Sequence, residues 1–226
     1  MSMREWVKLP TEWIRLGGLK RFRWEADRGS DNVAALIALI AIAHHADDEN
    51  GVAKLTYNDL QGCTNLSRAK LSAGLTVLEE NNIVVREPCG RSTYRLVDYG
   101  LVRWGKLPAR RLYASGNIIG FSEFHLRKVV ELHALKVFLL VIERRDNGTN
   151  LANISYEKIQ DYSGIARHQI KSAISLLAAN GLLHVEHVPS DASQYGISNA
   201  YRLPFIDPYS HMGTKGRGLD KADLSF

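Results

Sequence analysis

The sequence of 226 residues contains only two cysteines, Cys63 and Cys89. They cannot form a disulfide framework, and neither has a Cys or His partner at the spacing of a zinc site. With no secretory leader, this cysteine usage indicates a reducing cytoplasm. Long apolar runs are also missing, because the longest, Val33 to Ala43, is too short to span a bilayer. It predicts a buried helix, and we expect no membrane partner.

Catalytic and metal-binding motifs are also missing. The chain has neither a glycine-rich phosphate loop nor a nucleophile elbow. The segment 44–48 (His-His-Ala-Asp-Asp) is better explained by a helix end and a solvated turn than by a metal site, because adjacent helical residues point about 100° apart. His184 and His187 lie three apart on a predicted strand and so face opposite sides. We therefore expect no enzyme activity, no metal and no cofactor.

Positive charge is modest overall but concentrated in one region. The net charge is +5 and the isoelectric point about 9.2. Between Val84 and Arg111, basic residues far outnumber the acids Glu87 and Asp98, which favours a nucleic-acid partner over a merely solvated connector. The basic residues are Arg86, Arg91, Arg95, Arg103, Lys106, Arg110 and Arg111.

Residues 55–97 have the pattern of a helix-turn-helix followed by a hairpin. Thr56 and Ser67 are suited to begin two successive helices, and residues 83–86 and 93–97 read as two strands. This order predicts a winged helix, a domain whose second helix, the recognition helix, fits the DNA major groove.

The same pattern occurs a second time. Residues 56–60 match residues 155–159, and the spacing of 99 residues carries the apolar positions of one recognition helix onto the other. Trp6–Pro10 reappears as Trp104–Pro108, Asn50-Gly51 as Asn147-Gly148, and Tyr94–Leu96 as Tyr201–Leu203. The order of these matches indicates a tandem duplication of a unit of about 98 residues.

The duplication predicts a mainly α protein with small β wings (α+β). We expect a first winged-helix domain over residues 1–100, a second over 101–208 and a flexible tail over 209–226. Each unit would begin with a leading segment that packs against its own winged helix. The tryptophans of residues 1–30 are expected to pack this arm onto the first domain rather than stack on bases.

The outward faces of the two recognition helices are basic and polar, without an acid. This favours contact with double-stranded DNA, where Arg reads guanine and Gln reads adenine. The candidate residues are Ser67, Arg68, Lys70, Ser72, Arg167, His168, Gln169 and Lys171. Of the hydroxyl residues on these helices, we expect phosphate contacts or simple surface; they are Ser67, Ser72, Thr76, Ser172 and Ser175.

The domain plan resembles that of replication initiator proteins of plasmids and mobile elements, which bind repeated sites at an origin through two tandem winged helices. The resemblance covers most of the chain and rests on the domain plan and the internal duplication. Trp6–Pro10 is also similar to the start of winged-helix replication proteins of phages and mobile elements. The resemblance implies host replication partners such as a helicase loader, and dimers that oppose origin binding.

The chain ends in Leu224-Ser225-Phe226, which is similar to the bacterial sliding-clamp-binding motif. In that motif a glutamine precedes the Leu-x-Phe ending, and Lys221 stands in its place here. Leu224 and Phe226 would insert into an apolar pocket of the clamp. The alternative is an ordinary disordered end.

We therefore expect a cytoplasmic, nucleoid- or plasmid-associated protein that binds specific DNA sequences, most simply as a replication initiator. A transcriptional regulator or autorepressor would share the DNA contacts but need no replication partners. A scaffold that uses winged helices to bind proteins of the replisome or of segregation is the alternative of another class.

Overall fold

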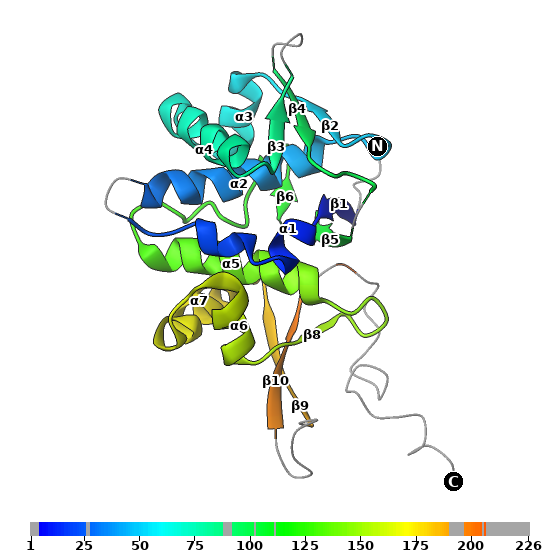
Figure 1. Cartoon of the computed structure of the whole chain (residues 1–226), viewed down its shortest axis with the longest axis vertical. Helices are drawn as coiled ribbons and strands as arrows, with labels where there is room; N and C mark the ends of the chain where they lie inside the picture. Colours follow the sequence, from blue (N-terminus) through cyan, green and yellow to red (C-terminus); the bar gives the residue numbers. More distant parts are fainter. Residues whose placement is uncertain are drawn as a thin grey trace.

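The structure, a computed structural model, describes residues 5–25, 28–87, 92–101, 103–110, 112–189, 197–204 and 206. It is a mixed α/β structure in which helices predominate and the sheets are small. Figure 1 shows the first half of the chain (residues 5–101) stacked on the second half (residues 103–206) along the longest axis. Within the described parts of the chain, no helix is both long and apolar enough to cross a membrane.

The first half is built on one buried helix, α2 (Gly29–His45), whose residues 33–43 are all buried as the apolar run predicts. A helix-turn-helix and a three-stranded sheet of order β2-β4-β3 pack around it. Its further elements are β2 (Val52–Lys54), α3 (Tyr57–Thr64), α4 (Arg68–Glu80), β3 (Val84–Arg86) and β4 (Thr93–Leu96). The antiparallel strands β3 and β4 lie at the top of Figure 1.

The second half repeats this order of elements and the order of strands, β8-β10-β9. Its central helix is α5 (Val129–Arg144), and β9 and β10 extend at the bottom of Figure 1. Its further elements are β8 (Leu151–Asn153), α6 (Tyr156–Ser163), α7 (Arg167–Ala179), β9 (His184–Pro189) and β10 (Ile197–Arg202).

The turns between the helices use the same hydrogen bonds in both halves. The hydroxyls of Thr64 and Ser163 each donate to the carbonyl four residues back at 2.5 Å and each accept from the backbone N–H two residues on. Asn65 and Gly164 then end the first helix of each pair in the left-handed conformation, with φ of 56° and 70°. Each pair of equivalent residues is 99 positions apart.

The acidic turn that follows each central helix shows which residues of α2 and α5 are equivalent. Asp47 accepts hydrogen bonds from the N–H groups two and three residues on, and Asp146 does the same. Asn50 therefore corresponds to Thr149, and the expected match of Asn50-Gly51 with Asn147-Gly148 is wrong. Equivalent residues of α2 and α5 are therefore also 99 positions apart.

The two leading segments pair with each other. β1 (Trp6–Pro10) and β5 (Trp104–Pro108) form an antiparallel ladder in which Trp6 lies opposite Pro108, Lys8 opposite Lys106 and Pro10 opposite Trp104. The two indole rings stack with centroids 5.6 Å apart and planes inclined by 15°. Because equivalent residues occupy opposite ends, the ladder is symmetrical about the Lys8–Lys106 pair.

The segments that follow each leading strand pack on the opposite half of the molecule. Helix α1 (Glu12–Arg15) contacts α5, and the short helix η1 (Gly18–Arg21) contacts α6. From the second half, the hairpin of β6 (Tyr113–Ala114) and β7 (Asn117–Ile118) packs on α3. The leading strands contact the central helix of their own half as expected, β1 with α2 and β5 with α5. The segments α1, η1 and β7, which follow them, pack across the two halves in addition.

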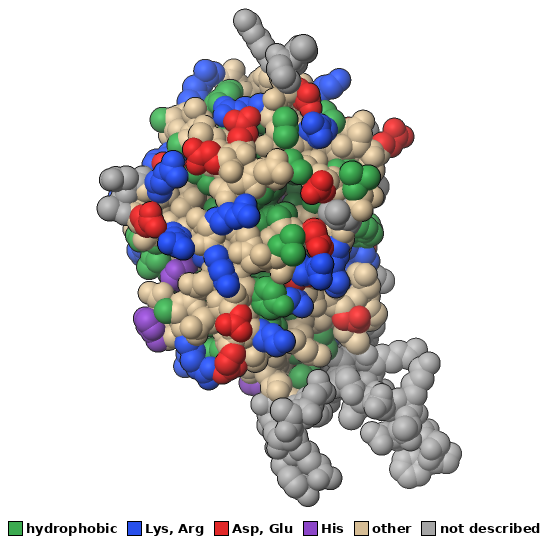
Figure 2. Space-filling model, in the orientation of Figure 1, with side chains coloured by type: hydrophobic (Ala, Val, Ile, Leu, Met, Phe, Trp, Pro, Cys, Tyr) green, Lys and Arg blue, Asp and Glu red, His purple; other side chains and the backbone are tan. Residues whose placement is uncertain are grey.

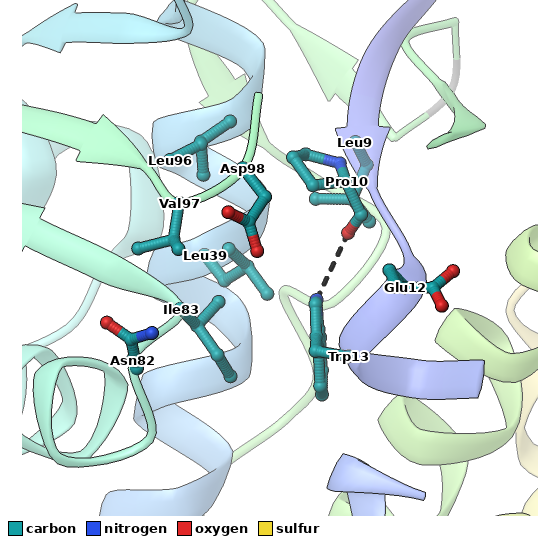
Figure 3. A pocket seen from close by; sticks show the side chains of 10 residues that line it. All are labelled: Leu9, Pro10, Glu12, Trp13, Leu39, Asn82, Ile83, Leu96, Val97 and Asp98. Carbon is teal, nitrogen blue, oxygen red and sulfur yellow. Dashed lines mark hydrogen bonds between the residues drawn. The ribbon is translucent and has the colours of Figure 1, made fainter. Parts of the chain in front are cut away.

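Trp13 lies where this arm meets the first half. Its Nε1 donates to the Pro10 carbonyl at 3.1 Å, and the ring faces a small cavity lined also by Leu39 and Ile83 (Figure 3). The cavity has a volume of about 20 Å³, far below that of a small-molecule site. Trp13 thus packs the arm onto the first half as expected, and Trp6 instead stacks across the halves.

Helix α5 begins only at Val129, although Ser122 is a residue type that could cap an earlier start. The reason is Glu131, whose buried carboxylate accepts hydrogen bonds from the N–H groups of His125, Arg127 and Lys128 at 2.9–3.3 Å. These bonds hold the preceding segment in turns. Leu126 within it has a φ of 60°, which ends helical geometry there.

Candidate nucleic-acid interface

Arg68 is the first residue of α4 and is exposed. Its Nη2 donates to Oδ1 of Asn58, ten residues earlier on α3, at 2.5 Å. The Ser67 hydroxyl caps the helix by accepting from the Lys70 N–H at 3.3 Å. Ser67 and Arg68 therefore sit at a helix N-terminus, where the backbone dipole favours an anion.

Lys70 does not point freely into solvent as predicted. Its Nζ lies 2.7 Å from Oδ1 of Asp31 and 2.6 Å from Oγ of Ser30, both in the first turn of α2. Helical spacing could not reveal this ion pair, because its acid lies 39 residues earlier in the chain. Ser72 remains exposed on the outer face of α4.

The first residue of α7 repeats the arrangement of Arg68. Arg167 is exposed, and its Nη1 binds the carboxylate of Glu157, again ten residues earlier on the preceding helix. His168 and Lys171 are exposed, and Gln169 is half-buried. An acid from α6 thus shares the face that was expected to carry none, although such an exposed pair contributes only about 0–1 kcal/mol.

The described arginines of the wing and the connector have acidic partners. The count of charges along the chain therefore overstates the positive charge that is available to DNA, since each carboxylate competes with a phosphate. The pairs are Arg86 with Glu79, Arg95 with Glu87 at 2.8 Å, Arg103 with Glu143 at 3.7 Å and Arg110 with Glu5 at 3.3 Å.

The remaining connector residue, Lys106, lies over the ring of Trp6, with its Nζ 5.0 Å from the centroid. Lys8 has the equivalent contact with Trp104 at 5.5 Å. Arg91 and Arg111 lie outside the described residues, as do Leu224 and Phe226 of the tail.

The adjacent histidines at the end of α2 pack rather than bind metal. The ring of His44 lies 4.7 Å from that of Tyr113, and His45 Nε2 lies 2.5 Å from the Tyr113 hydroxyl. Burial, reinforced by His45, lowers the pKa of His44 to about 3. The two histidines lie at the expected helix end and pack on β6, and the expected exposed turn follows them at residues 48–50. Within the described ranges, no three His, Cys, Asp or Glu side chains are grouped to hold a metal ion.

A basic hollow lies beside α7 that sequence analysis did not identify. Lys20 and Arg23 line it from the arm, His133 and Lys136 from α5, and Gln169 from α7. The sequence signal is Lys136 itself, a cation next to the apolar run Val137–Ile142 of α5. The hollow could not be predicted, because its walls come from three separate segments. Figure 2 shows several Lys and Arg side chains across the middle of the face that it depicts.

The second helix of each pair, α4 and α7, thus presents an exposed arginine at its N-terminus. Comparison with protein-family models and with curated proteins found no match to this chain.

Proposed function

We propose that the chain consists of two winged-helix units derived by duplication and that it binds double-stranded DNA in a sequence-specific manner. The observation that carries this proposal is the repeated arrangement of Arg68 and Arg167. Each stands at the exposed start of the second helix of a helix-turn-helix, and each is held by the residue ten positions earlier. A side chain held before binding loses less entropy when it meets a base edge.

The ladder of β1 and β5 supports a definite arrangement of the DNA site. A two-fold axis through the Lys8–Lys106 pair would relate the two units, in agreement with the reciprocal packing of α1, η1 and β7 on the opposite half. Two recognition helices related in this way read half-sites in inverted orientation. We infer that one protein binds two inverted half-sites whose centres lie about one helical turn apart.

The recognition helices would read the base sequence, while the other cations would hold the protein in position on the DNA backbone. Arg68 and Arg167 would donate two hydrogen bonds each to a guanine edge, while Arg110 and other exposed cations contact phosphates. Arg110 is about half exposed beside Glu5, so its weak ion pair would give way to a phosphate.

The experiment measures affinity for the specific site and for random duplex over a range of salt concentrations. Arg68→Ala and Arg167→Ala should each weaken specific binding by about 1–3 kcal/mol, and Arg110→Ala should mainly reduce the salt slope by about one. Arg15→Ala is a matched control, because Arg15 is also an exposed arginine with a carboxylate partner, Glu12 at 2.5 Å. If Arg68→Ala weakened all sequences equally, its role in base reading would be disproved.

The biological role that fits this activity best is replication initiation for a plasmid or mobile element, with host replication proteins as partners. A transcriptional regulator would occupy a single site over a promoter. A protein-binding scaffold would show only non-specific, salt-sensitive affinity for duplex DNA.

A further inference from the structure

The hollow beside α7 has a volume of about 600 Å³ and is open to solvent. Lys20 and Arg23 stand at its exposed rim, and His133 and Lys136 are buried in its wall. None of the side chains that line it is acidic. This distinguishes the hollow from the wing and the connector, where the described arginines have carboxylate partners.

Lys136 is the most unusual member of the wall. The side chain is only 3% exposed, and its Nζ has a single hydrogen-bond partner among the described residues, the Phe22 carbonyl at 2.8 Å. An ammonium group has three N–H donors, so the remaining two are available to a ligand. Burial and the neighbouring Arg23 lower the pKa of Lys136 to about 8, which leaves it mostly protonated at neutral pH.

The fold itself does not require cations at these positions. At the spacing of 99 residues, the first half has Ala34 in place of His133 and Ile37 in place of Lys136, and both are buried in its core. The counterpart of Gln169 is Lys70, which the first half neutralises with Asp31. At these equivalent positions, positive charge without a carboxylate is thus found beside α7 and not beside α4.

We propose that this hollow binds a phosphate group. Lys136, Lys20 and Arg23 supply the charge, while His133 and Gln169 supply uncharged hydrogen-bonding groups. A phosphate oxygen can take up the donors of a buried ammonium, which otherwise lack partners at a considerable cost in free energy. The phosphate would come either from the DNA backbone next to α7 or from a free phosphate compound such as a nucleotide.

The test uses the full chain and three probes: sodium pyrophosphate, ATP and a DNA duplex containing the specific site. Calorimetry measures the first two, and duplex affinity is measured as a function of salt. The variants are Arg23→Gln, Lys20→Gln and Lys136→Met. The first two change exposed side chains, so they should fold normally if Lys136→Met does not. Lys54→Gln, an exposed lysine on β2 in the other half, is the matched control.

Binding of pyrophosphate or ATP that Arg23→Gln weakens at least tenfold would support the proposal with a free ligand. No binding of either, with a salt slope for DNA that falls by about one in Arg23→Gln and Lys136→Met, would support it with DNA as the source. Unchanged behaviour with all three probes would overturn it. The DNA-binding proposal fails separately: a protein without specific affinity for DNA that still binds pyrophosphate would contradict that proposal and leave the phosphate site standing.

Discussion

Gly74→Ala tests the close packing that holds the first recognition helix in place. A Cβ at Gly74 would lie 2.8 Å from the backbone nitrogen of Ala35 and 2.9 Å from the carbonyl carbon of Ala34, both on α2. Ordinary carbon contacts lie near 3.5–4.0 Å, so α4 must move away by roughly half an ångström or more. Backbone atoms of a buried helix cannot move aside as a flexible side chain can.

The size of the effect follows from two opposing contributions. Alanine in place of glycine stabilises a helix by roughly 0.5–1 kcal/mol, whereas overpacking a tight contact costs about 1–3 kcal/mol. The net result should be destabilisation by about 1–2 kcal/mol, which lowers the midpoint of thermal unfolding by about 2–8 °C in a chain of this size.

Gly62→Ala is the matched control. Gly62 lies in the exposed part of α3, and a Cβ there would have no atom within 4 Å. The helix contribution then acts alone, and the midpoint should rise. Thermal unfolding followed by circular dichroism compares the two variants. A rise for Gly74→Ala equal to that for Gly62→Ala would refute the close approach of α4 to α2.

Three further predictions concern the caps, the ladder and the buried histidines. Thr56→Ala removes the side-chain cap of α3 and should lower the free energy of unfolding by about 1 kcal/mol in urea titrations. Trp104→Ala removes the stack on Trp6 and should lower the free energy of unfolding by about 1–2 kcal/mol. The loss is limited because Trp104 is 40% exposed already. An unchanged denaturation midpoint would contradict the stack. Burial lowers the pKa of His44 to about 3 and that of His133 to about 4, so both stay neutral in the folded protein while they gain protons in the unfolded chain below about pH 6.5. The free energy of unfolding should therefore decrease as the pH is lowered from about 6.5 to 4, by about 1.4 kcal/mol per pH unit for each histidine. In urea titrations across this pH range, His133→Leu should remove half of this slope.

Local features of the fold could be predicted from the sequence. Thr56 and Ser67 cap helices where their side chains suggest, because a cap depends on residues three positions apart. Gly181, just after α7, has a positive φ of 66°, a conformation that glycine adopts without a steric penalty and that is common after a helix end. The short strands β2 and β8 were missed, since three residues carry too little alternation to indicate a strand.

Features that depend on distant residues could not be predicted. The partner of Lys70 is Asp31 on another helix, and the partner of Arg110 is Glu5, more than a hundred residues earlier. A sequence pattern gives the charge of a residue but not the charge beside it. The pairing of β1 with β5 is of the same kind, because the repeated Trp-x-Lys-Leu-Pro segment indicates equivalence and not contact.

The measurement that tests the central proposal most directly is a footprint of the purified protein on the DNA that flanks its own gene, repeated at several salt concentrations. We expect protection that persists at physiological salt, with two inverted half-sites for each bound protein. Several evenly spaced copies would support initiation at an origin, and one protected site over a promoter would support a regulator. Diffuse protection that disappears as salt rises would contradict sequence-specific binding and favour a protein-interaction scaffold.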